Sequence, residues 1–98
     1  MVVHIVMIKL KESEKSSKNL NMLEERIKSL SSKISILESL ETGLNFSNED
    51  RAMDFVLVAK FKDRDGLREY ANHPEHLKVI QDIKDVVLYT KVVDYEEM

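Results

Sequence analysis

The segment of residues 68–80, REYANHPEHLKVI, contains the side chains of this chain that are best suited to proton transfer. It holds Tyr70, His73 and His76, with Pro74 between the two histidines. Proline favours the first position of a helix and disfavours helical geometry in the residue before it, so we expect a helix to begin at Pro74. His76 then lies in the first turn, where the positive end of the helix dipole favours the neutral imidazole that a general base requires.

Tyr70 and His76 together form a minimal pair for removing a proton next to a carbonyl group. The imidazole would act as the base, and the phenol would donate a hydrogen bond to the carbonyl oxygen as negative charge develops there. His4 would join this pair if its ring lies on the sheet face that helices cover, which the alternation of residues alone does not decide. We therefore take His76, Tyr70 and His4 as the candidate catalytic residues.

Other interpretations of the histidines are open. A buried histidine is commonly satisfied by a backbone carbonyl or a water molecule, and His73 before Pro74 is well placed to cap a helix. Zinc bound by His4, His73 and His76 is disfavoured, because the proline interrupts the helix and no carboxylate that would orient the ligands can be identified. Nothing in the spacing singles out His76 as an axial haem ligand. No metal and no cofactor are predicted.

Four strands are expected to position these residues. Residues 2–10 and 53–62 are apolar on both faces, which is typical of central strands. Residues 36–46 alternate more weakly, as an edge strand with one wet face does. The closing VVLYTKVVDYE is rich in β-branched and aromatic residues and is expected to form the fourth strand.

Helices are expected between these strands. The longest begins near Ser13, and a short one follows the capping residues Asp63 and Asp65. The last helix begins at Pro74. Apolar residues three and four apart predict the buried faces: Leu20, Leu23, Ile27, Leu30 and Ile34 in the first helix, and Leu77, Ile80 and Ile83 in the last.

The order β-α-β-β-α-β predicts an α+β, ferredoxin-like domain over residues 1–98, with a four-stranded antiparallel sheet. Helices cover only one face of such a sheet, so the other face would expose an apolar patch that is unusual in a monomer. We therefore expect a homodimer in which two sheets pack face to face through this open face.

Composition narrows the partners and the location. Fifteen basic and 18 acidic residues leave a net charge of −3 without a basic block, which disfavours nucleic-acid binding. The chain has no cysteine, and its apolar start is interrupted by His4 and Lys9, so it is read as a strand rather than a signal peptide. No apolar run is long enough to cross a bilayer. We expect a cytoplasmic protein without nucleic-acid or membrane partners.

Three motifs, VHIVMIKLK, YANHPEHLKVI and KVVDYE, resemble in order and spacing those of the stress-responsive A/B barrel domain (Dabb) family. The resemblance runs over essentially the whole chain and implies a dimeric α+β barrel. Most members of that family are uncharacterised or linked to stress responses, and a few are polyketide cyclases that close a ring by aldol condensation. By position, the histidine, tyrosine and histidine of those cyclases match His4, Tyr70 and His76.

The expected function is therefore a homodimeric module that binds a small hydrophobic ligand or takes part in a stress response. The alternative is a cyclase-like or isomerase-like enzyme acting on a small hydrophobic carbonyl compound, with His76 as base and Tyr70 as donor. The first helix lacks the tyrosine that the cyclases place in the pocket, so the pocket should be more apolar. Besides the candidate catalytic residues, its expected lining is Leu23, Ile27, Ile80 and His73.

Overall fold

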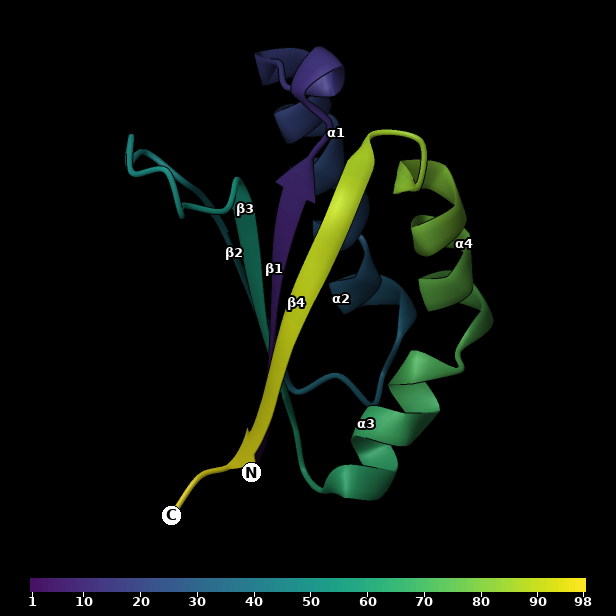
Figure 1. Ribbon diagram of the computed structural model, residues 1–98. Helices are drawn as coiled ribbons and strands as arrows, with labels where there is room; N and C mark the ends of the chain where they lie inside the picture. The colour runs from purple at the N-terminus through teal and green to yellow at the C-terminus, as the bar shows by residue number, and fades with distance from the viewer.

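The computed structural model describes residues 1–98 and confirms the predicted ferredoxin-like fold (Figure 1). Its four strands form one antiparallel sheet in the order β2-β3-β1-β4, so β1 and β3 are central, as their two apolar faces predicted. The elements are β1 (Val2–Leu10), a 3-10 turn (Glu12–Glu14), α1 (Ser17–Lys28), α2 (Leu30–Lys33), β2 (Ser39–Leu44), β3 (Phe55–Phe61), α3 (Arg64–Ala71), α4 (Pro74–Ile83) and β4 (Val87–Glu96).

Side-chain caps define where three helices begin. The Ser16 hydroxyl accepts a hydrogen bond from the Asn19 backbone N–H at 3.1 Å and caps α1. The Asp63 carboxylate accepts a hydrogen bond from the Gly66 backbone N–H at 2.8 Å and caps α3. Before Pro74, His73 caps α4, because its Nδ1 accepts the Glu75 N–H at 3.1 Å.

The first predicted helix is shorter than expected and is interrupted. It begins at Ser17 rather than near Ser13, and α1 ends at Lys28 before the single turn of α2. The Ser29 hydroxyl donates to the Arg26 carbonyl oxygen at 2.6 Å, which is the kind of local bond by which serine competes with regular helix hydrogen bonds. Most of the predicted apolar stripe is nevertheless buried: Leu23, Ile27, Leu30 and Ile34.

The buried face of α4 differs from the prediction. Val79 and Ile83 are buried, whereas Leu77 is 52 % exposed and Ile80 is 45 % exposed. His76, Val79 and Ile83 are three and four residues apart and share the face toward the sheet, and the helical rotation turns Leu77 away from it. The prediction that Leu77 faces inward is therefore wrong, and Ile80 lies at the edge of the buried face.

All helices lie on one side of the sheet, and the opposite face has no helix (Figure 1). Its side chains are largely apolar. In the central strands they are half-buried apart from Val3, which is 1 % exposed, and on β4 the side chains of Tyr89, Val93 and Tyr95 are between 44 % and 51 % exposed. None of the helices has the length and the apolar character needed to span a membrane.

Candidate functional site

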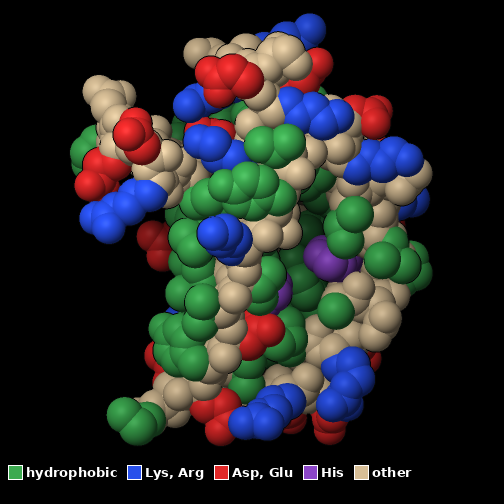
Figure 2. All heavy atoms as spheres, viewed as in Figure 1, with side chains coloured by type: hydrophobic (Ala, Val, Ile, Leu, Met, Phe, Trp, Pro, Cys, Tyr) green, Lys and Arg blue, Asp and Glu red, His purple; other side chains and the backbone are tan.

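A cavity of about 410 Å³ lies on the helix-covered side of the sheet, between α4 and strands β1 and β4. Fifteen residues line it, and eleven of these are hydrophobic. In the space-filling view the cavity is a hollow between β4 and α4 in which histidine side chains are visible (Figure 2). Its size and apolar lining are typical of small-molecule sites.

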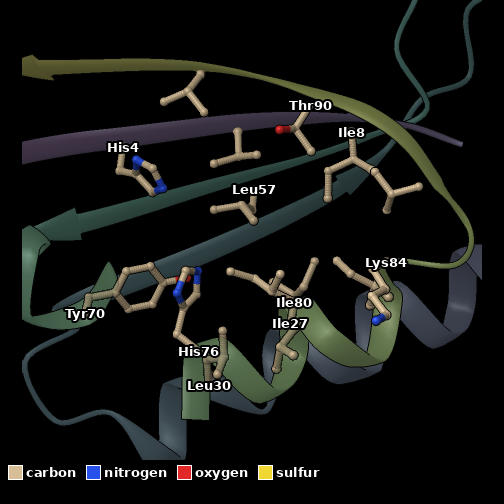
Figure 3. Close-up of a pocket in the computed structure, with 15 residues that line it drawn as sticks. His4, Ile8, Ile27, Leu30, Leu57, Tyr70, His76, Ile80, Lys84 and Thr90 are labelled. Atoms are coloured by element: carbon tan, nitrogen blue, oxygen red, sulfur yellow. The ribbon is translucent and has the colours of Figure 1, made fainter. Parts of the chain in front are cut away.

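His4, Tyr70 and His76 meet at one end of this cavity (Figure 3). They come from β1, α3 and α4 respectively. The ring centroids of Tyr70 and His76 are 4.4 Å apart, and those of His4 and Tyr70 are 6.2 Å apart. The ring of His4 thus lies on the helix-covered face, which was the condition for it to join the other two.

His76 is held in one tautomer by the backbone. Its Nδ1 lies 3.1 Å from the carbonyl oxygen of Ala71. A carbonyl oxygen only accepts hydrogen bonds, so Nδ1 carries the proton and Nε2 of the neutral ring keeps a free lone pair. Burial lowers the pKa of His76, and the neighbouring His4 and His73 lower it further against the opposing effect of the Ala71 bond. The imidazole is therefore neutral at physiological pH, as a general base must be.

Tyr70 presents a protonated phenol beside this imidazole. Its side chain is 1 % exposed and also packs against Phe61, with ring centroids 5.0 Å apart. Burial raises the pKa of Tyr70 to about 12. At neutral pH the hydroxyl therefore remains a hydrogen-bond donor.

His4 has a partner that was not anticipated. Its Nδ1 bonds the carboxylate of Asp94, which faces it from β4 in the strand register. An ionised carboxylate only accepts, so Nδ1 donates and Nε2 of His4 is left for other contacts. Asp94 belongs to the KVVDYE motif, but only the pairing of β1 with β4 shows which side chain it meets.

The other predicted pocket residues divide into two groups. Ile27 and Ile80 line the cavity. Leu23 does not, because its side chain on α1 is fully buried in the core. His73 also lies outside the cavity, where it caps α4. Sequence reasoning missed Lys84 and Thr90, which line the cavity as well. No group of three His, Cys, Asp or Glu side chains is arranged to hold a metal ion.

An antiparallel β2-β3-β1-β4 sheet with helices on one face defines a ferredoxin-like α+β protein, here with a cavity beside β4. The model of the stress responsive A/B barrel domain family matches residues 2–97. The chain therefore belongs to this family. No match was found among curated proteins.

Solved structures agree with this assignment. A dimeric ferredoxin-like protein of unknown function from Bacteroides fragilis is 32% identical, with a TM-score of 0.85 over 98% of this chain and 95% of that one. A Dabb family protein from Mesorhizobium loti is 21% identical, with a TM-score of 0.81 over 99% and 96% of the two chains. The hydroxynitrile lyase of Passiflora edulis is 18% identical, with a TM-score of 0.82 over 96% and 90%. The last two similarities show the shared fold alone.

Proposed function

We propose that the protein binds a small hydrophobic carbonyl compound in the cavity beside β4. The observation that carries this proposal is the combination of an apolar wall with hydrogen-bonding groups at one end of it. The Tyr70 hydroxyl is protonated and can donate to a carbonyl oxygen, while the apolar wall removes the rest of the ligand from water.

Filling the cavity entrance tests this binding. Ile80 lines the cavity and is half-exposed, so Ile80→Trp should reduce the space without unfolding the helix. We expect calorimetric titration with an aliphatic methyl ketone to show at least about a tenfold weaker affinity for this variant, because contacts with the apolar wall are lost. Leu77→Trp, at a similarly exposed position of α4 outside the cavity, is the control. Equal ketone affinity in both variants would contradict the proposed location.

A second candidate function is proton abstraction next to the carbonyl group, as in a cyclase or an isomerase. The hydrogen bond between His76 Nδ1 and the Ala71 carbonyl favours it, because this bond leaves Nε2 as the basic atom. In this mechanism Nε2 removes the proton, the Tyr70 hydroxyl stabilises the enolate oxygen, and His4 completes the polar end of the cavity.

Deuterium exchange tests this step without knowledge of the natural substrate. In heavy water, an enzyme that forms the enolate replaces the hydrogens next to the carbonyl of a bound ketone with deuterium. We expect His76→Ala to abolish this exchange while ketone affinity stays within a few-fold, and we expect His73→Ala to change neither. Exchange by the His76→Ala variant at the wild-type rate would remove the catalytic assignment and leave the binding function.

We also propose that the protein is a homodimer formed through the open sheet face. The Bacteroides fragilis relative is described as dimeric, and the open face of this chain is largely apolar. Val58→Asp puts a charge in the middle of this face and should give monomers or insoluble protein. Leu77→Asp, on the outer side of α4, should leave the mass in sedimentation experiments unchanged. A soluble Val58→Asp dimer would show that this face is not the interface. A cytoplasmic location remains a prediction from the sequence.

A further inference from the structure

We propose that the ligand is an apolar oxo acid, with its carbonyl group at the His4, Tyr70 and His76 end of the cavity and a carboxylate at the opposite end, near Lys84. This inference rests on the proposed binding of a carbonyl compound and adds a second polar group at a defined distance from the first.

The polar residues of the cavity lie at two separate ends. Apart from Tyr70, four of the lining residues are polar, and His4 and His76 lie at one end while Lys84 and Thr90 lie toward the other (Figure 3). His76 and Lys84 are eight residues apart along α4 and its C-terminal cap, which corresponds to about 12 Å of helix.

The strand wall gives a matching separation. Thr90 pairs with Ile8 on β1, and Ile8 is four residues from His4, which corresponds to about 13 Å of strand. Both walls of the cavity therefore carry their polar residues at nearly the same spacing along the backbone. Between the two ends the lining is hydrophobic, with Val6, Ile27 and Leu57 among its side chains. The cavity thus fits a molecule that is apolar in its middle and polar at both ends.

The charge of Lys84 indicates what the second polar group is. Lys84 takes part in none of the ion pairs of the protein, whereas Lys78 on the same helix pairs with Glu75 at 3.7 Å. One ammonium group, that of Lys84 on the helix wall, and one hydroxyl, that of Thr90 on the strand wall, match the one charge and the acceptor oxygens of a carboxylate. A lysine after the last turn of a helix also stabilises the helix end by itself, so the test must separate ligand affinity from this structural effect.

Three probes of equal chain length separate ligand affinity from helix stabilisation: decanoate, decanamide and the methyl ketone with the same number of carbon atoms. The variants are Lys84→Gln and, as the matched control on the same helix, Lys78→Gln. Calorimetric titration at low and high salt measures each affinity. We expect wild type and Lys78→Gln to bind decanoate about three- to fivefold more tightly than decanamide, the range of an exposed ion pair. The preference should disappear in Lys84→Gln and should weaken at high salt, with ketone affinity unchanged.

The other outcomes separate failure of this inference from failure of the proposed function. Equal affinity for acid and amide in the wild type, or a preference for the acid that survives in Lys84→Gln, overturns the oxo acid while ketone binding still supports the proposed function. Loss of ketone affinity in Lys84→Gln overturns it as well, because the lysine then acts through the fold. Failure of all three probes to bind the wild type overturns the proposed function together with this inference.

Discussion

The two longest helices of this protein meet the same sheet in different ways. Helix α1 packs directly against β2, and its Leu23 is completely buried and lies outside the cavity. Helix α4 covers the β4 side, where a cavity remains and Val92 of β4 is 51 % exposed although it faces the helices. One half of the helix layer is thus a closed core that stabilises the fold, and the other half holds the space and polar groups that a ligand needs.

The largest effect should come from truncating the same residue type on each helix. Leu23→Ala on α1 removes a fully buried side chain and should cost about 2–5 kcal/mol of the free energy of unfolding. Leu77→Ala on α4 removes a side chain that is 52 % exposed and should cost less than about 1 kcal/mol. Urea unfolding at equal protein concentration measures both. Similar losses would contradict the difference in burial between these two positions.

A smaller loss of stability is expected from changing the buried carboxylate of Asp54. Asp54 is 3 % exposed, accepts the Leu10 N–H at 2.8 Å and lies 3.1 Å from Lys15 Nζ. Asp54→Asn should cost about 1–3 kcal/mol, because the N–H loses its charged acceptor and the lysine loses its partner. Asp82→Asn, at a more exposed ion pair with Arg26, should cost less than about 1 kcal/mol.

Acid titration provides a second test of Asp54. Burial by itself would raise the pKa of this carboxyl, but the bonds to Leu10 and Lys15 outweigh burial and hold the pKa below its ordinary value. The unfolded chain then takes up the proton first, so the stabilisation is complete above the unfolded pKa and is lost as the pH falls through the folded one. Wild type should lose more stability than Asp54→Asn over this range. If stability falls equally with pH in the two proteins, folding does not lower the pKa of Asp54.

The smallest effect should appear in the cavity half, near neutral pH. Burial lowers the pKa of His76, so the unfolded state binds a proton more readily than the folded state does. The folded state should therefore lose stability as the pH falls from above the ordinary histidine value of 6.5 toward the lower folded pKa. His76→Gln should remove this part of the pH dependence, as measured by urea midpoints between about pH 8 and about pH 5. His73→Gln provides the comparison, and the same flattening in both variants would contradict the assignment to His76.

Much of the fold and part of the site could be predicted from local patterns. Apolar residues on both faces identified β1 and β3 as central, and Pro74 marked the start of α4. These features depend on neighbouring residues, so their signals lie in short stretches of sequence. The sequence predicted that Leu77 is buried, but Val79 is buried and Leu77 is exposed. The two apolar stripes of α4 are nearly equivalent in the sequence, and only packing against the sheet decides which of them is buried.

The sequence by itself determined the element order, the central strands and the presence of a tyrosine and two histidines suited to proton transfer. Only the tertiary structure decided that His4 faces the helices, that Asp94 binds it, and that Lys84 lies at the other end of the same cavity. The physical reason is that side-chain alternation leaves open which sheet face the helices cover. Contacts between β1, β4 and α4 depend on strand pairing and helix placement over long sequence separations.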